Sequence, residues 1–185
     1  MSNSKQLFVT LKMIQSLDGS IARTIDDKLD WGSTQDKASF KQVRLANDVI
    51  VMGSTTFVQT PKSFLRNQSV IIISRDPDSL QSQYLDQKGN QNWFFCVPDP
   101  QQILDFASSK GWFKILLAGG GRVNSIFLKA GLVDILEITL APYIFNAPTK
   151  VFGSDVLEDI ALELIDCQSL GSGELLLRYK LKRQV

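Results

Sequence analysis

Short apolar runs separated by polar segments fill the first two thirds of the chain. Residues 7–14 alternate between two faces that are both apolar apart from Thr10 and Lys12, a pattern that predicts a mostly buried strand. The later runs are short and continuous, as the central strands of a parallel sheet are. They cover residues 49–53, 70–74, 93–97 and 115–118.

Helical segments are predicted between these runs. Residues 36–46 are predicted to form a helix, with Phe40 among its apolar positions and its end near Asn47. Residues 100–110 begin with a proline in the first turn, where its missing N–H removes no helical hydrogen bond. A further helix is expected directly after Gly121.

The final third changes character, because strand-like runs follow one another there with little helix between them. They cover residues 135–140, 161–167 and 175–181. The Gly-Ser-Gly turn at residues 171–173 predicts a hairpin, so the last strand is expected to lie antiparallel to its neighbour. This strand alternates apolar with basic residues, which predicts an outer strand with one solvated face.

Strands that first alternate with helices and then follow one another predict an α/β fold. We expect a mostly parallel, mixed central sheet with helices on both faces and a C-terminal antiparallel hairpin. The 185 residues, of which 44% are hydrophobic, suffice for one core, so residues 1–185 are expected to form a single domain. Residues 23–32 are polar enough for a surface loop, and residues 75–92 form the one stretch whose composition is compatible with disorder.

Charge and residue content exclude several function classes. Lys and Arg total 20 against 19 Asp and Glu, so neither nucleic acid nor an anionic membrane is an expected partner. No apolar run approaches the roughly 20 residues that span a bilayer, and the polar N-terminus has no apolar signal core, so a cytoplasmic protein is expected. Cys96 and Cys167 each lie in an apolar run and are expected to be buried free thiols. The chain has no histidine, which excludes histidine-based nucleophilic catalysis, and no metal site is expected.

Residues suited to phosphate follow four of the predicted strands. In an α/β sheet, ligands bind beyond the carboxyl ends of the strands. Glycines allow close backbone approach, hydroxyls and helix N–H groups donate hydrogen bonds, and arginine supplies charge. Each group by itself is also compatible with a plain turn or cap, whereas the agreement of all four favours a phosphate-containing ligand. The residues are Ser16 and Asp18; Gly53, Ser54, Thr55 and Thr56; Ser74 and Arg75; and Gly119, Gly120, Gly121 and Arg122.

Two charged residues are candidates for the chemistry. Asp18 is the only carboxylate at such a strand end, so it is the expected proton donor or relay. The pKa of an aspartate is roughly 4, so donation at neutral pH requires partial burial or a water relay, and an Asp-Gly turn is the structural alternative. Lys12 needs a partner if it is buried, and we expect Asp18 or a ligand phosphate in that role. The alternative is an edge lysine that faces water.

Taken in order, these strand ends resemble the dihydrofolate-reductase-like fold, and in particular the reductase domain of riboflavin biosynthesis. The resemblance spans residues 7–152 and implies a three-layer fold. The segments that match are VTLK at residues 9–12, SLDGSIA at 16–22, DVIVMGSTT at 48–56, GGG at 119–121, GLVD at 131–134 and Ala141-Pro142.

The resemblance implies an NADPH-dependent oxidoreductase. Its implied substrate is 5-amino-6-(5-phosphoribosylamino)uracil or the deamination precursor of that compound, reduced at the ribosyl group in its open-chain imine form with a proton from Asp18. It places residues 53–56, Ser74 and Arg75 near the adenosine and its 2′-phosphate, and residues 119–121 at the diphosphate. It also places Asp18 and Lys12 beside the nicotinamide and the substrate, and it implies a homodimer.

Two departures from the family pattern keep alternatives open. Many members carry a glutamate where this chain has Gly119, and residues 60–66 match the usual Asn-Pro-x-Leu-Thr-x-Arg segment poorly. Ser16, Lys62 and Arg66 are the expected substrate contacts, the last two for its phosphate. An NADPH reductase of the same fold with another small substrate, and a non-catalytic NADP-binding dimer, are the alternative functions.

Overall fold

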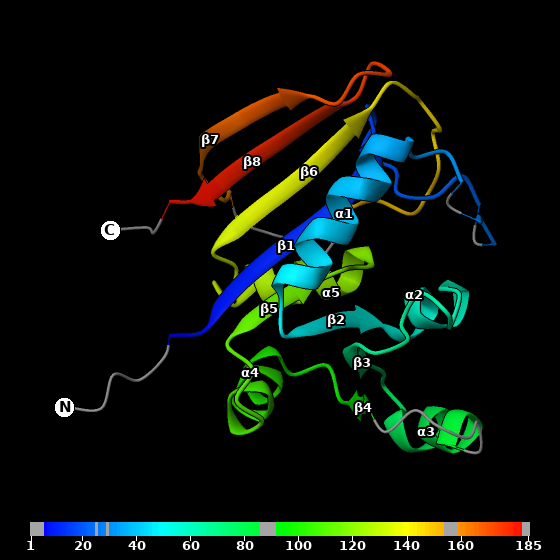
Figure 1. Cartoon of the computed structure of the whole chain (residues 1–185), viewed down its shortest axis with the longest axis vertical. Coiled ribbons are helices and arrows are strands. Elements are labelled where there is room, and N and C mark those ends of the chain that lie inside the picture. The colour runs from blue at the N-terminus through cyan, green and yellow to red at the C-terminus, as the bar shows by residue number, and fades with distance from the viewer. Residues whose placement is uncertain (1–5, 25, 29, 86–91, 154–158, 183–185) are drawn as a thin grey trace.

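One eight-stranded sheet organises the computed structural model, which describes residues 6–24, 26–28, 30–85, 92–153 and 159–182. The strands lie in the order β4-β3-β2-β5-β1-β6-β8-β7, as Figure 1 shows. The first six of these pair in parallel, and β8 pairs antiparallel with both β6 and β7. The strands are β1 (Phe8–Ser16), β2 (Val49–Gly53), β3 (Ser69–Ile73), β4 (Trp93–Cys96), β5 (Lys114–Leu117), β6 (Ile135–Ala141), β7 (Leu162–Ser169) and β8 (Leu175–Leu181).

Helices cover both faces of this sheet, which confirms the predicted three-layer α/β architecture. On one face, apolar residues of α4 and α5 pack against β1, β2, β5 and β6. On the other, α1, α2 and α3 pack over β2, β3 and β4 around the buried Phe57. The helices are α1 (Thr34–Ala46), α2 (Ser54–Gln59), α3 (Pro77–Leu85), α4 (Pro100–Ser109) and α5 (Gly121–Lys129).

The continuous apolar runs became central strands because both of their faces are covered. In β2, Ile50 faces the layer of α1, α2 and α3, whereas Val49 and Val51 face α4 and α5. All three side chains are at most 1% exposed. A strand that is buried on both faces is typically a continuous run of apolar, often β-branched residues, with no alternation of apolar and polar positions.

The C-terminal hairpin is confirmed, but its strand order differs from the prediction. We expected the last strand to be the outer one, whereas β8 lies between β6 and β7 and β7 forms the edge. Every residue of β7 is exposed. The expected burial of Cys167 is therefore wrong, because no helix of the described chain packs over this strand, while Cys96 in β4 is half-buried.

Part of the segment expected to be compatible with disorder is a helix. Pro77–Leu85 forms α3, whose Leu80 and Tyr84 lie one turn apart and pack against the second core cluster. The remainder of this prediction, residues 86–91, lies outside the described residues. No helix in the described part of the chain combines the length and apolar character needed to cross a membrane.

Candidate functional site

Two glycine turns lie side by side at the carboxyl ends of β2 and β5. They comprise residues 53–56 and 119–122, and we call them the paired turns. The Gly53 amide donates a hydrogen bond of 2.8 Å to the Gly119 carbonyl, which joins them directly. Each turn begins a helix whose N-cap residue, Gly53 for α2 and Gly120 for α5, makes no side-chain capping bond. First-turn N–H groups without an internal acceptor carry partial positive charge and attract anions.

The three consecutive glycines have different structural reasons to be glycine. Gly119 has φ +81°, and a Cβ there would lie 2.7 Å from the Met13 side chain. A Cβ on Gly121 would lie 2.2 Å from the Lys150 carbonyl oxygen, so this residue is required by internal packing. A Cβ on Gly120 would meet nothing nearer than Thr56 Oγ1 at 3.5 Å. Of the three, Gly120 is therefore the one where an added Cβ would make only ordinary contacts, with Thr56 and Ile21.

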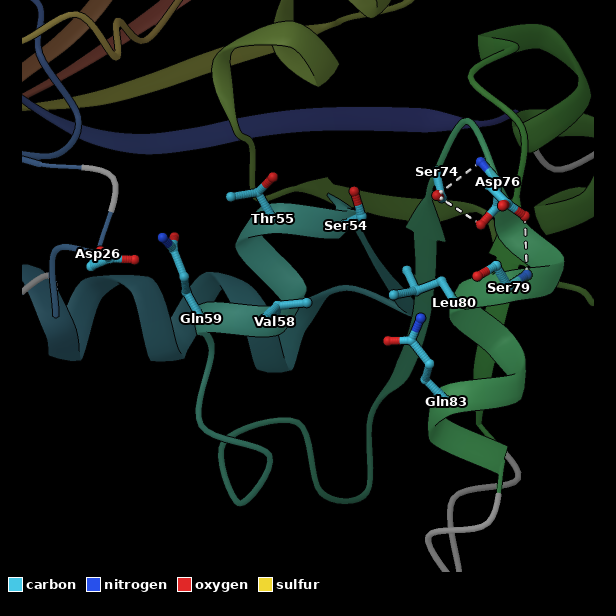
Figure 2. A pocket seen from close by; sticks show the side chains of 10 residues that line it. All are labelled: Asp26, Ser54, Thr55, Val58, Gln59, Ser74, Asp76, Ser79, Leu80 and Gln83. Atoms are coloured by element: carbon cyan, nitrogen blue, oxygen red, sulfur yellow. Dashed lines mark hydrogen bonds between the residues drawn. The ribbon is translucent and has the colours of Figure 1, made fainter.

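A cavity of about 420 Å³ lies between α2 and α3, and we call it the α2–α3 cavity. Figure 2 shows hydroxyl side chains of α2 on one side and residues of α3 on the other. Ser54, Thr55 and Ser74, predicted from the sequence as cofactor contacts, line it, whereas Arg75 and Arg122 are exposed and lie outside its lining. The residues that line it are Asp26, Ser54, Thr55, Val58, Gln59, Ser74, Asp76, Ser79, Leu80 and Gln83.

Asp18 is the centre of a hydrogen-bond cluster after β1. The hydroxyls of Ser16 and Ser20 donate to its carboxylate at 2.6 and 2.8 Å, and Lys150 Nζ lies 2.9 Å from Oδ2. The backbone amides of Phe145 and Asn146 donate to the same carboxylate at 3.0 and 3.1 Å. The cluster thus ties the end of β1 to the segment that follows β6.

These bonds change the chemistry expected of Asp18. Hydrogen bonds from Ser16, Lys150 and Ser20 hold the pKa of the Asp18 carboxyl far below its usual range. The carboxyl is therefore ionised at neutral pH and has no proton to give. Direct donation does not fit this environment, and the role of Asp18 as a relay through water stays a prediction. The carboxylate also accepts a hydrogen bond from Lys150, a residue that the sequence did not single out.

Replacing Asp18 with asparagine should lower thermal stability in a pH-dependent way. Because the pKa of Asp18 is depressed in the folded state, its stabilisation is complete above the unfolded pKa of about 4 and is lost as the pH falls further. The melting temperatures of the wild type and Asp18→Asn should therefore differ most at neutral pH and converge below about pH 4. Calorimetry across this range measures the difference, with the exposed α4 variant Asp105→Asn as control. A difference in melting temperature that stayed constant with pH would contradict the lowered pKa of Asp18.

Lys12 has a different partner from the expected one. It is 1% exposed, and its Nζ lies 3.2 Å from Oε2 of Glu137, the residue directly opposite it on β6. Arg178 of β8 approaches the other oxygen of Glu137, with Nε 3.2 Å from Oε1. Two cations therefore share one buried carboxylate, and Asp18 takes no part in this group.

The first turn of α1 adds a carboxyl that the sequence analysis missed. Asp36 is 7% exposed, and burial raises the pKa of its carboxyl, partly offset by Thr139 and Lys12. It lies close to Gly32, where a Cβ would stand 3.3 Å from its Oδ2. The sequence contained a pattern that could have indicated Asp36: it follows the N-cap Ser33 by three residues, as the acidic residue of a capping box does. Glu137 had a similar signal, as a single acidic residue inside an apolar strand.

The predicted phosphate contacts Lys62 and Arg66 lie after α2. The Lys62 ammonium donates to the carbonyls of Phe57 and Thr60, the latter at 3.1 Å, and stands 4.0 Å from the centre of the Phe57 ring. Desolvation lowers its pKa. Lys62 thus caps the end of α2, and a phosphate contact would require this cap to open. Arg66 is exposed.

Comparison with solved structures shows the same fold in other proteins, among them two reductases. A riboflavin biosynthesis protein from Shewanella sp. PV-4 is 23% identical with a TM-score of 0.77, over 96% of this chain and all of that one. The riboflavin biosynthesis reductase of Saccharomyces cerevisiae is 18% identical with a TM-score of 0.68, over 98% of this chain and 93% of that one. Dihydrofolate reductase from Enterococcus faecalis, complexed with NADP(H), is 18% identical with a TM-score of 0.65, over 95% and 96% of the two chains.

A family comparison extends this likeness from fold to sequence. The family model described as the RibD C-terminal domain matches residues 7–176, from the start of β1 into β8. The match includes the paired turns, the Asp18 cluster and the Lys12–Glu137 pair. With these groups in place on a dihydrofolate-reductase-like sheet, the chain belongs to the family of RibD C-terminal domains.

Proposed function

We propose that this oxidoreductase is an NADPH-dependent reductase of the riboflavin pathway, with 5-amino-6-(5-phosphoribosylamino)uracil or its deamination precursor as the substrate. The observation that carries the proposal is the pair of uncapped helix starts joined by the bond from Gly53 to Gly119. Both helix starts follow strands at the carboxyl edge of the sheet, where first-turn N–H groups attract anions and where a dinucleotide diphosphate would bind.

The residues present fit a nicotinamide dinucleotide. Gly120 has no side chain to keep a ligand from the backbone of the paired turns, and the hydroxyls of Ser54, Thr55 and Ser74 extend the site into the α2–α3 cavity. When bound, the reduced nicotinamide supplies the hydride. A dihydrofolate reductase of the same fold forms a complex with NADP(H), which is consistent with this use of the sheet edge.

The substrate site is proposed between β1, β6 and the first turn of α1. Lys12 and Arg178 both approach Glu137, and their positive charge would stabilise negative charge on the substrate. Burial raises the pKa of the Asp36 carboxyl, which makes it a candidate proton source for the imine nitrogen beside Asp18. The ring of Trp31 packs edge-on against Tyr143 and Phe145 after β6. Its buried indole N–H has no hydrogen-bond partner among the described residues, which favours a ligand acceptor nearby.

A direct assay tests the proposed reaction. The purified protein is mixed with NADPH and the phosphoribosylamino-pyrimidine, and the absorbance of the reduced nicotinamide is followed while mass spectrometry detects a product heavier by two hydrogen atoms. We expect oxidation only when the pyrimidine is present. Tight NADPH binding without oxidation would favour the alternative of a non-catalytic NADP-binding dimer. Oxidation with a different small substrate would favour the alternative of an NADPH reductase of the same fold that acts on another compound.

We also propose that the protein is a homodimer through the exposed end of its sheet. Large apolar side chains of β7 and β8 face solvent there, namely Leu162, Leu164, Ile165 and Leu175, which are 36–54% exposed. An uncovered edge strand with apolar side chains favours pairing with another chain. Leu164→Lys should therefore shift the protein from dimer to monomer in analytical ultracentrifugation. Leu45→Lys, at an exposed leucine on α1, should leave the dimer intact, and a Leu164→Lys variant that remained a dimer would refute this interface.

A further inference from the structure

The turn between β7 and β8 places a buried carboxylate against the start of α1. Glu174, which directly precedes β8, is 2% exposed although its neighbours Gly173 and Leu175 are exposed. Both of its carboxylate oxygens accept hydrogen bonds from Ser33: the amide donates to Oε1 at 2.9 Å, and the hydroxyl donates to Oε2. A carboxylate is costly to bury unless such bonds replace its water, so the two bonds from Ser33 hold Glu174 in place.

Ser33 connects Glu174 with the first turn of α1. It is the N-cap residue of this helix, and its Oγ accepts the Asp36 amide at 3.0 Å while its hydroxyl donates to Glu174. The β7–β8 turn and the start of α1 lie at the same end of the molecule (Figure 1). One serine hydroxyl therefore links Glu174 to Asp36, the candidate proton source of the substrate site.

The turn that carries Glu174 is fixed by its own contacts. The Leu170 amide donates to the Glu174 carbonyl at 3.0 Å across the turn. Gly173 has φ +80°, and a Cβ there would lie 3.2 Å from Cγ of Pro142, which follows β6. The turn thus packs closely against the segment after β6 and has little room to move relative to it.

The charge of Glu174 also acts on Asp36. Burial raises the pKa of the Asp36 carboxyl, and the negative charge of Glu174 adds to this effect. Thr139, Lys12 and Lys37 act in the opposite direction. The charged side chains of this region are Lys12 of β1, Lys37 of α1, Glu137 of β6, Glu174 of the turn and Arg178 of β8.

We propose that Glu174 is a positioning residue of the substrate site, which holds the start of α1 through Ser33 so that Asp36 lies against β1 and β6. Its two bonds to Ser33 and its burial assign it to the support of α1 and not to contact with the substrate. The inference rests on the proposed function, because it concerns the proton source of the same site.

A titration of the Asp36 carboxyl tests this role without the reduction step. NMR spectroscopy follows the side-chain carboxyl signals of the wild type and of Glu174→Gln across pH, and Asp36→Asn identifies the Asp36 signal. Glutamine keeps the size of the side chain and an acceptor for the Ser33 amide but removes the charge. We expect the Asp36 midpoint to move to lower pH in Glu174→Gln, because a negative neighbour no longer favours the protonated form.

Turnover gives a second measurement of the same role. In Glu174→Gln, kcat at neutral pH should fall about tenfold while KM changes less than about threefold, because fewer molecules carry the proton. Ser33→Ala removes the linking hydroxyl and keeps the charge of Glu174. Its Asp36 midpoint should also move to lower pH, because a loosened first turn admits water, and it keeps the test open if Glu174→Gln does not fold. The double variant should be no slower than the more affected single variant, since both changes break one link.

Glu163→Gln is the matched control, since it makes the same chemical change at an exposed residue of β7. It should leave the Asp36 midpoint and kcat unchanged. A midpoint that moved equally in Glu163→Gln would show a general effect of charge and overturn the inference. A loss of kcat in Glu174→Gln with an unchanged Asp36 midpoint would show a merely structural role and overturn it as well.

The titration distinguishes failure of this inference from failure of the proposed function. If the Asp36 midpoint moves as expected but the pyrimidine is never reduced, the proposed reaction is wrong and the control of Asp36 by Glu174 stands. If the pyrimidine is reduced but the Asp36 midpoint is the same in the wild type and Glu174→Gln, only the inference about Glu174 is overturned.

Discussion

Gly121→Ala should destabilise the protein by about 3 kcal/mol, whereas Gly120→Ala should fold almost normally. The added methyl on residue 121 would stand 2.2 Å from the Lys150 carbonyl oxygen and 3.4 Å from the Gly153 amide nitrogen. Both are backbone atoms, so α5 must move away from the segment that follows β6. Helix propensity alone predicts the opposite sign, since alanine is favoured over glycine by about 1 kcal/mol. Thermal and urea unfolding measure the difference.

Gly120→Ala is the matched control at the neighbouring position. Its methyl would meet Thr56 Oγ1 at 3.5 Å, an ordinary contact, and the backbone at Gly120, with φ −73°, accepts alanine. We expect a stability change below about 1 kcal/mol. In the proposed site the methyl would stand between the paired turns and the diphosphate, so dinucleotide affinity should fall about tenfold when measured by nicotinamide fluorescence. Normal affinity in Gly120→Ala would refute the proposed diphosphate position.

Lys12→Met should cost about 3 kcal/mol of stability and abolish turnover. It leaves the Glu137 carboxylate buried with Arg178 as its remaining cation, and removal of one member of a buried ion pair is strongly destabilising. Methionine keeps the length of the side chain, so the loss reports on charge more than on volume. Urea unfolding gives the free energy, and the nicotinamide assay gives the turnover.

A double variant separates the structural from the catalytic role of Lys12. Lys12→Met combined with Glu137→Gln removes both charges of the pair and should recover most of the lost stability, because neutral replacements of buried pairs are tolerated. Turnover should remain absent if the ammonium acts on the substrate. A double variant that recovered both stability and turnover would show that Lys12 serves the fold alone.

The order of helices and strands could be predicted from the sequence, because short continuous runs of β-branched residues are typical of central strands that are buried on both faces. Val49–Gly53 and Ser69–Ile73 came out as strands close to their predicted bounds, and the helix expected at residues 36–46 begins two residues earlier, at Thr34. The short helix α3 was not readable, because its apolar face consists of little more than Leu80 and Tyr84. Its stability comes from packing against β4, a contact that local propensity does not encode.

The sequence likewise indicated the glycines and hydroxyls at the strand ends of the proposed dinucleotide site. These residues could be found because their expected role depends on the conformation of the backbone around them. What only the tertiary structure decided is which charges meet. Lys12 and Glu137 are 125 residues apart and Asp18 and Lys150 are 132 apart, so sheet register and a folded-back segment selected these partners. Electrostatic energy depends on distance and burial, which exist only after folding. That is why the sequence could single out Asp18 as a candidate but could not name Lys150 as its partner.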